Sequence, residues 1–191
     1  TESLHFSPKN VVGSYAVAVR VKTTAKGSFA QLRLNGTATP IALPESATDG
    51  QWHTLLLSHY HAAGQTFIYL DGKQIDNYAD TQTIGEVVLG GINMQVSDWM
   101  FYRSALNADE VQAVEAGKLL RSSLELYCPL NDGNLDNMAQ STNTITHHGT
   151  PSAIDNPDSA VLSAEAVDVL GRPVGEDYKG VVIIAGKKIL R

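Results

Sequence analysis

The sequence predicts an all-β fold with one short helix. Of the 191 residues, 43% are hydrophobic, and they occur in short segments separated by glycine, proline, asparagine and serine. Short apolar segments bounded by turn-forming residues are typical of strands. Pairs of Asn or Asp with Gly indicate tight turns between antiparallel neighbours. These pairs are Asn35-Gly36, Asp49-Gly50 and Asp71-Gly72.

The first clear strand covers residues 14–23. Its larger apolar side chains occupy every second position, at Tyr15, Val17, Val19 and Val21. Alternate residues of an extended chain point to the same side. We therefore expect one face of this strand to lie on a hydrophobic core.

Further strands follow, each bounded by turn or proline signals. The segment at 41–43 lies between Pro40 and Pro44. This favours a sheet edge, because proline cannot donate to a strand ladder. The remaining segments follow one another as in an antiparallel meander. The strands predicted after the first cover residues 29–34, 41–43, 52–60, 66–70, 73–75, 84–89 and 94–103.

The helix is predicted to begin at Asn107. Its side chain can cap the first turn, and Glu110 can reach back to the N–H group of the cap residue. Gly117 suits the end of the helix. We expect Asp109, Glu110 and Glu115 to form a solvated face rather than a catalytic carboxylate pair.

The rest of the chain is predicted to contain one more strand, a linker and a tail. The strand covers residues 124–130, and a polar loop follows it. Residues 151–160 are poor in apolar side chains and contain proline, as is typical of a linker. Residues 161–191 hold two strand-like runs, and Ala185-Gly186-Lys187 predicts a hairpin turn within the second, which makes a C-terminal β-hairpin. The predicted organisation is therefore a β domain over 1–150, this linker and the hairpin tail.

Composition argues against several classes of partner. The formal net charge is -6 and no long basic run occurs, so we expect no nucleic-acid partner. No apolar run reaches the roughly 18 residues of a membrane helix, so we expect no membrane insertion. The chain opens on Thr1 without a leader, as expected of a mature or trimmed chain. Cys128 is the only cysteine, and we interpret it as a packed thiol.

Five segments together resemble a known family. In order and spacing they resemble the laminin G-like, concanavalin A-like jelly-roll domains of Bacteroidetes-type bacterial surface proteins, over residues 4–118. The resemblance implies an antiparallel jelly-roll sandwich in which the DGxWH segment starts a strand. The segments are SYAVAVRVKT (14–23), DGQWHTLLLSHY (49–60), FIYLDGKQI (67–75), VVLGG (87–91) and SDWMFYRSALNADEVQAV (97–114).

The chain departs from this family at its ligand-binding face. Arg20 stands where relatives often have tryptophan, and Ser97-Asp98 replaces a frequent acidic pair. The resemblance therefore does not imply the ligand of the relatives. Residues 124–150 resemble the start of such a domain although they follow the helix. They either begin a truncated repeat or fill the place of the missing first strand, and we favour the second because an unfilled position leaves an unpaired edge.

The C-terminal segment resembles that of many secreted Bacteroidetes proteins, including proteins exported by the type IX route. The shared pattern consists of LGRPV at 170–174, KGVVII at 179–184 and GKK at 186–188. Only this last stretch of the tail matches. The resemblance implies a secreted or cell-surface location.

The histidines do not predict a metal site. His59 and His61 are two residues apart in the predicted strand and would share a face, where imidazoles could bind zinc. No cysteine pair and no acidic third ligand accompany them in the strand, so we interpret them as surface histidines. For His53 packing suffices, and His147-His148 are adjacent on an extended chain and would point apart.

A calcium site is the one metal hypothesis. Asp132, Asn134 and Asp136 offer oxygens at alternate positions, and Ca²⁺ prefers such ligands. The resemblance adds weight, because laminin G-like relatives often carry calcium. The competing interpretation, ordinary turn chemistry, is the one we favour.

No catalytic constellation is evident. Glycan hydrolysis needs two carboxyl groups about 5 to 10 Å apart, and no strand presents acids at alternate positions on an apolar framework. Nucleophile-elbow, phosphate-loop and metalloprotease motifs are also missing from the sequence. A glycan hydrolase on this scaffold would rest on fold analogy alone.

Aromatic side chains could form a sugar platform. We expect Trp52, Trp99 and Phe101 to pack in the core, and Tyr78, in a polar stretch, to lie within reach of a ligand. The sequence thus favours a non-catalytic module of a secreted or cell-surface bacterial protein, binding a glycan or a surface protein. The alternatives are the glycan hydrolase and a structural spacer attached to a catalytic domain.

Overall fold

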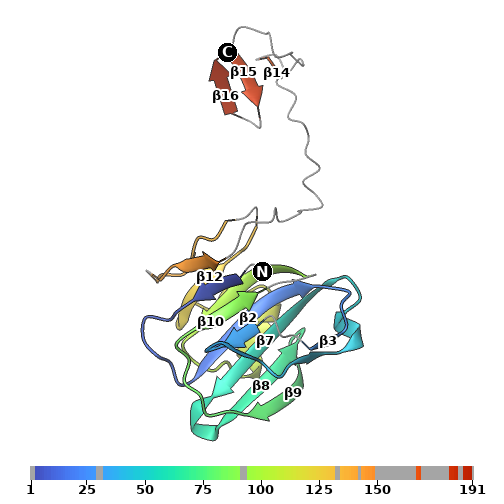
Figure 1. Ribbon diagram of the computed structural model, residues 1–191, viewed down its shortest axis with the longest axis vertical. Helices are drawn as coiled ribbons and strands as arrows, with labels where there is room; N and C mark the ends of the chain where they lie inside the picture. The colour runs from blue at the N-terminus through green and yellow to red at the C-terminus, as the bar shows by residue number, and fades with distance from the viewer. Residues whose placement is uncertain are drawn as a thin grey trace. The chain divides into compact units, whose positions relative to one another are not determined.

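The computed structural model describes most of the first 148 residues and three short strands of the tail. Residues 3–28, 32–90, 94–131, 134–141, 143–148, 167–168, 181–184 and 187–190 are described. The chain divides into two compact units, Thr1–Ser152 and Ala153–Arg191. The first unit is an antiparallel β-sandwich of the jelly-roll type with one α-helix (Figure 1), which confirms the predicted fold class.

One layer of the sandwich is a six-stranded sheet. Every neighbouring pair in it is antiparallel, and β2 and β7 pair along their length from Tyr15–His59 to Lys22–Trp52. The Asp71-Gly72 turn joins β8 to β9 as predicted, and Asp71 has a left-handed φ of 49°. In spatial order the strands are β12 (Leu124–Cys128), β11 (Gln95–Tyr102), β2 (Tyr15–Lys22), β7 (Trp52–Tyr60), β8 (Gln65–Leu70) and β9 (Lys73–Ala79).

The other layer is a five-stranded sheet. Its strand β1 was not predicted from the sequence, because four residues are too few to show a periodicity. The predicted edge segment forms β6 (Ala42–Leu43), which pairs only with β3 (Gly27–Ser28) in a small separate sheet. In spatial order the strands are β13 (Ile145–His148), β1 (Ser3–Phe6), β10 (Val87–Gly90), β4 (Leu32–Leu34) and β5 (Thr37–Ala38).

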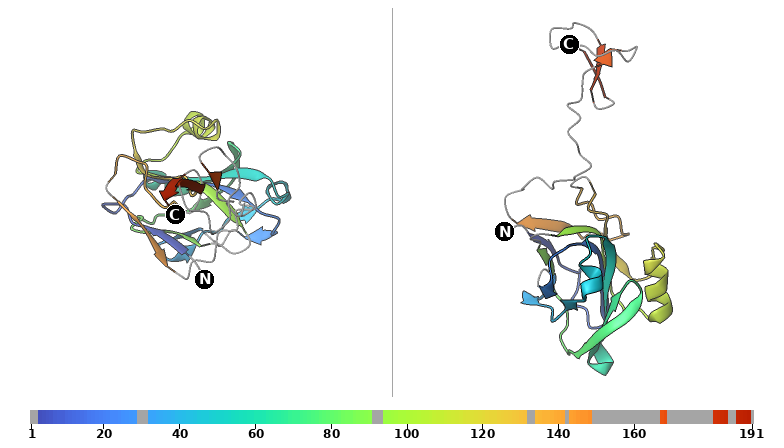
Figure 2. Two further views of the ribbon diagram at one scale, coloured as in Figure 1. Left: turned by 90° about the horizontal axis from the view of Figure 1, so that it is seen from above. Right: turned by 90° about the vertical axis from the view of Figure 1, so that its right-hand side faces the viewer.

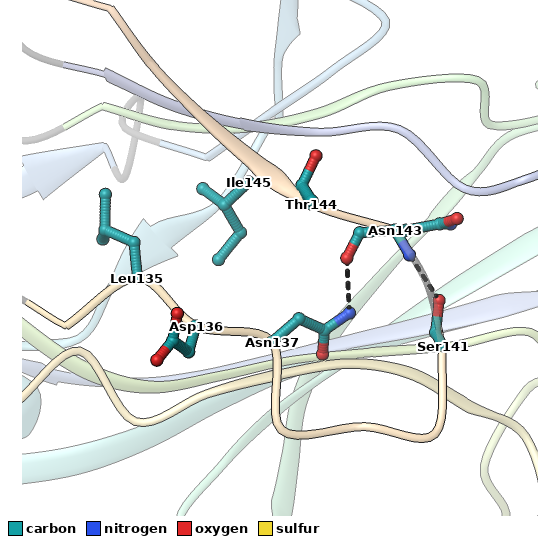
Figure 3. A pocket seen from close by; sticks show the side chains of 7 residues that line it. All are labelled: Leu135, Asp136, Asn137, Ser141, Asn143, Thr144 and Ile145. Carbon is teal, nitrogen blue, oxygen red and sulfur yellow. Dashed lines mark hydrogen bonds between the residues drawn. The ribbon is translucent and has the colours of Figure 1, made fainter.

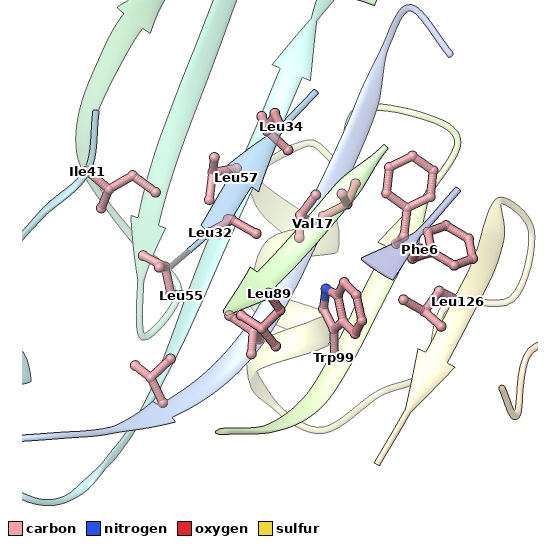
Figure 4. Packing of buried hydrophobic residues seen from close by; sticks show 14 of the residues in the cluster. Phe6, Val17, Leu32, Leu34, Ile41, Leu55, Leu57, Leu89, Trp99 and Leu126 are labelled. Atoms are coloured by element: carbon pink, nitrogen blue, oxygen red, sulfur yellow. The ribbon is translucent and has the colours of Figure 1, made fainter. Parts of the chain in front are cut away.

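The main core lies between the two sheets. Alternation along β2 turns Val17 inward, where it meets Leu57 of β7 and Leu32 of the opposite sheet (Figure 4). Trp99 and Phe6 come from different sheets, and their rings meet edge to face at 6.4 Å. All five side chains are fully or almost fully buried, so this core holds the layers together.

A second, smaller core lies on the outer side of the six-stranded sheet. The helix α1 (Ala108–Glu115) covers Ala16 and Ala18 of β2 with Val111 and Val114 (Figure 2). Small alanines allow the helix to approach the sheet closely. Half of β2 is therefore buried on both faces, and not on one face only as alternation alone indicates.

Two strands that follow the helix lie at the edges of the sandwich. The strand β12 pairs with β11 at the edge of one sheet, and β13 pairs with β1 at the edge of the other. The described part of residues 124–150 thus supplies an edge strand to each layer. In the second unit, β15 (Val181–Ile184) and β16 (Lys187–Leu190) form the predicted hairpin, and β14 (Val167–Asp168) pairs with β15 as a third strand.

Candidate functional site

An exposed tryptophan marks the outer face of the six-stranded sheet. Trp52 retains 39% of its surface and is the one exposed Phe, Trp or Tyr among the described residues. The expectation that it packs in the core is wrong, whereas Trp99 and Phe101 are fully buried as predicted. Trp52 pairs with Lys22, on the face that carries Ala18 and Ala16, but beyond the part that α1 covers.

Polar side chains extend from Trp52 in a row across four adjacent strands. The guanidinium carbon of Arg20 lies 5.6 Å from the centre of the indole ring, a cation–π geometry. Arg20 Nη1 lies 3.8 Å from Asp98 Oδ2, and the Tyr127 hydroxyl donates to Asp98 Oδ1 at 3.2 Å. We call Trp52, Arg20, Asp98 and Tyr127 the outer-face row. Three spacings of about 4.8 Å give it a length of roughly 14 Å.

A β-bulge places Asp98 in this row. Between Ser97 and Met100, β11 has two residues where β2 has one, and Asp98 adopts a φ of 49°. The extra residue lets Trp99 enter the core while the Asp98 carboxylate stays on the outer face. Ser97 Oγ also donates to this carboxylate, at 3.1 Å.

Tyr78 does not lie in the outer-face row. It is half-buried on β9 and packs against the main core. Burial raises the pKa of its hydroxyl to about 12, despite a hydrogen bond with Thr66 that opposes the shift. The contact of Tyr78 with a ligand therefore stays a prediction.

Two of the three residues of the calcium hypothesis are described, and they form a turn. Asn134 Oδ1 accepts the backbone N–H of Asp136 at 2.7 Å, so the oxygen proposed as a ligand serves the loop itself. Asp132 lies outside the described residues. In the part of the chain that the structure describes, no cluster of three or more His, Cys, Asp or Glu side chains is arranged to hold a metal ion.

A shallow, open pocket of about 480 Å³ lies beside this turn (Figure 3). Two side chains in its lining bind the backbone of Asn143: Asn137 Nδ2 donates to the carbonyl of Asn143 at 3.0 Å, and the N–H of Asn143 donates to Ser141 Oγ at 3.1 Å. The lining residues are Leu135, Asp136, Asn137, Ser141, Asn143, Thr144 and Ile145.

The prediction that His59 is a surface histidine is wrong. It is fully buried and stacks on Tyr15 with ring centres 4.9 Å apart, while its Nδ1 lies 2.8 Å from Thr66 Oγ1. Burial lowers the pKa of His59. The strand ends before His61, which begins the short helix η2 (His61–Ala63) and is exposed. The two imidazoles are still neighbours, with ring centres 5.9 Å apart in an edge-to-face contact, although only His59 lies on the strand.

His53 joins two turns. Its Nδ1 lies 2.7 Å from Asp71 Oδ2, and its Nε2 lies 3.0 Å from Asp49 Oδ1. Burial alone would lower the pKa of His53, but hydrogen bonds to the two carboxylates outweigh it and the pKa is raised. Both ring nitrogens are thus hydrogen-bonded. We call His53, Asp49 and Asp71 the clamp, because they join the DGxWH segment to the YxDG segment.

Ser3, His5 and Glu86 form a chain of hydrogen bonds that resembles a hydrolase relay. Ser3 Oγ lies 2.9 Å from His5 Nε2, and His5 Nδ1 lies 2.9 Å from Glu86 Oε1. Acyl transfer also requires donors for an oxyanion. The strand β1 lies between β13 and β10, so its backbone N–H groups serve the sheet on both sides. We interpret these hydrogen bonds as positioning the His5 side chain on the face of the sheet.

No protein-family model matches the sequence, and no curated protein is significantly similar to it. Among solved structures, a candidate carbohydrate-binding protein from Bacteroides ovatus is similar with a TM-score of 0.53 and 13% identity. The match covers 78% of this chain, which spans 58% of the length of that structure. The shared feature is the fold.

Two further structures are similar at lower TM-scores. A heptameric SAP-like pentraxin from Limulus polyphemus matches with a TM-score of 0.46 and 13% identity, over 76% of this chain and 88% of its own. The binding domain of botulinum neurotoxin serotype D/C matches with a TM-score of 0.44 and 8% identity, over 57% and 37%. Within the described residues, no helix has the length and apolarity needed to cross a membrane.

Proposed function

We propose that the sandwich is a non-catalytic carbohydrate-binding module of a secreted or cell-surface bacterial protein, and that it binds its ligand on the outer-face row. The observation that carries the proposal is the exposure of Trp52 beside Arg20 on a flat sheet face. An indole presents a large, rigid apolar surface at low entropic cost. Stacking against the apolar face of a sugar ring would bury this surface.

The polar members of the outer-face row supply the hydrogen bonds that a sugar needs. Arg20 brings donors, Asp98 brings acceptors, and the Tyr127 hydroxyl can do both. Binding sites commonly combine an apolar surface with a few placed polar groups. A row of roughly 14 Å favours a ligand with several sugar rings over a monosaccharide.

Two resemblances support the finer parts of the proposal. The five family-like segments, which include His53 and Asp71, support a laminin G-like module. The tail pattern at 170–188 supports export of the protein. The Bacteroides ovatus structure, described as a candidate carbohydrate-binding protein, has the same fold.

A glycan array with the purified chain tests this function. We expect binding without release of reducing sugar, and loss of binding in Trp52→Ala. The matched control is Ile75→Ala on β9, because Ile75 is exposed to the same 39% as Trp52 and lies outside the outer-face row. Release of reducing sugar would favour the glycan hydrolase. Binding to a protein but to no glycan would favour a protein ligand, and a lack of binding on all arrays would favour the structural spacer.

Calcium binding remains a prediction with a separate test. If Asp132, Asn134 and Asp136 hold Ca²⁺, the ion stabilises the native state and must raise the melting temperature. The measurement is thermal unfolding in calcium and in chelator. An unchanged midpoint in about millimolar calcium, a typical concentration for extracellular sites, would count against the site.

A further inference from the structure

We propose that the outer-face row selects glycans that carry carboxylate groups, such as uronic acids. This inference rests on the proposed function and names the ligand class of the same site. It starts from the charges around Trp52. Two cations, Arg20 and Lys22, project from alternate positions of β2 onto the face that presents the indole, and Lys22 pairs directly with Trp52.

The Arg20 guanidinium is exposed to solvent and has only one weak ion pair in the part of the chain that the structure describes. Its side chain is 46% exposed, and the cation–π contact with Trp52 holds it close to the sheet. Its ion pair with Asp98 is a single loose contact at 3.8 Å. Among the described residues, it makes no other ion pair or hydrogen bond, so most of its N–H donors face solvent.

Asp98 does not neutralise this face. Its carboxylate already accepts hydrogen bonds from Ser97 Oγ and the Tyr127 hydroxyl, which satisfy part of its capacity. Lys22 has no ion pair within the described part of the chain. Two cations and one engaged carboxylate therefore leave an excess of positive charge, although the whole chain carries a formal net charge of -6.

The geometry of the guanidinium suits a carboxylate. A guanidinium is a planar fork that binds a planar carboxylate through two parallel hydrogen bonds. The Arg20 guanidinium lies over the indole ring, with its central carbon 5.6 Å from the ring centre, so a sugar ring that contacts the exposed part of Trp52 can place an equatorial carboxylate beside Arg20. The ring supplies affinity through its apolar face, and the carboxylate supplies selectivity through Arg20.

Titration calorimetry with oligogalacturonate and its fully methyl-esterified form tests the inference. The two ligands have the same sugar backbone and differ in charge. We expect oligogalacturonate to bind at least tenfold more tightly to the unmodified chain. Arg20→Gln should remove this preference, because it weakens binding of the acid at least tenfold and binding of the ester much less. Trp52→Ala should weaken binding of both ligands. Asp98→Asn should strengthen binding of the acid by removing the competing carboxylate.

The matched control is Arg33→Gln, which removes an exposed arginine from β4 in the other sheet and should change neither affinity. A carrageenan oligosaccharide, which carries sulfate esters and no carboxylate, separates the two sources of negative charge. Equal or tighter Arg20-dependent binding of this probe would overturn the preference for carboxylate.

The failure of this inference is distinguishable from the failure of the proposed function. Glycan binding that depends on Trp52 but is equal for the acid and the ester would overturn the carboxylate selectivity and leave the binding module intact. A lack of binding to any glycan by a folded chain would overturn both.

Discussion

At the residue scale, His53 shows how one side chain stabilises two turns through its charge. Carboxylates on both sides of the imidazole favour the imidazolium, which raises the pKa of His53, and the hydrogen bond from His53 lowers the pKa of Asp49. Asp71 Oδ1 also accepts the backbone N–H of Thr54 at 2.9 Å. The clamp therefore fixes the start of β7 against the turn that follows β8.

The clamp predicts a pH dependence of stability. A raised pKa means that the contribution of His53 is complete below its ordinary pKa of about 6.5 and is lost as the pH rises through the folded value. The lowered pKa of Asp49 means that its contribution is lost as the pH falls below about 4. We expect His53→Gln to be less stable by about 1 kcal/mol between these limits.

The measurement is the free energy of urea unfolding of both chains from roughly pH 4 to pH 9. The difference between the chains should shrink toward alkaline pH. His61→Gln is the control, because His61 is exposed and makes no comparable clamp. A difference that stays constant across this range would show that the clamp acts without charge.

At the scale of elements, the helix α1 owes its start to a capping box. Asn107 Oδ1 accepts the N–H of Glu110 at 3.0 Å, and Glu110 Oε2 accepts the N–H of Asn107 at 2.8 Å. The helix has only eight residues, too few to be stable in isolation. Its stability therefore depends on this cap and on packing over the small outer core.

We expect Asn107→Ala to cost about 1 kcal/mol in the free energy of unfolding, because the backbone N–H of Glu110 loses the side-chain oxygen to which it donates. Asn107→Asp should remain close to the unmodified chain, because aspartate caps equally well. Chemical denaturation measures both variants. If the alanine variant were as stable as the aspartate variant, packing alone would position α1.

The edge strand β12 depends on the side chain of Asn137 for some of its hydrogen bonds. Asn137 Oδ1 accepts the N–H groups of Tyr127 and Ala139, each at 3.0 Å, and its Nδ2 donates to the carbonyls of Glu125 and Asn143. The side-chain amide thus takes the place of a neighbouring strand along β12. In this way it joins the edge of one sheet to the segment that leads into β13.

Asn137→Ala should destabilise the sandwich by about 2 to 3 kcal/mol, because it leaves several backbone groups without partners. The control is Asn134→Ala, which removes one exposed hydrogen bond and should cost less than about 1 kcal/mol. Urea unfolding measures both variants. Equal effects would show that the Asn137 network is replaced by water.

At the scale of the whole molecule, the two sheets form one folding unit because their inner faces share a core. Trp99 reaches Phe6 of the opposite sheet, and Phe6 also packs on Phe101, with ring centres 5.4 Å apart. Burial of these aromatics gives the largest contributions that single side chains make to this core.

Trp99→Ala should therefore cost about 3 to 5 kcal/mol, as expected of a large-to-small change in a packed core. Trp52→Ala is the matched control, because it truncates the other tryptophan on an exposed face and should cost less than about 1 kcal/mol. Urea unfolding at neutral pH measures both. Similar costs for the two variants would contradict the assignment of one tryptophan to the core and the other to the surface.

The fold was largely predictable because its determinants are local. Alternation along β2 and β7, the Asp71-Gly72 turn and the cap at Asn107 each depend on residues close together in the sequence. Such patterns specify strands, turns and a helix start without knowledge of distant contacts. Residues 3–6 escaped notice, since a strand of four residues carries no usable periodicity.

The candidate site was not predictable in the same way. Periodicity assigned Trp52 to an apolar strand and His59 to a polar strand end, and both assignments were wrong about burial. The outer-face row joins residues from four strands that lie far apart in the sequence.

The sequence alone determined the fold class, the strand order along the chain and the helix start, because local sterics and hydrogen bonding suffice for these. Only the tertiary structure decided which part of the sheet α1 covers. That coverage depends on how distant side chains pack over β2, and it leaves Trp52 and Arg20 in solvent.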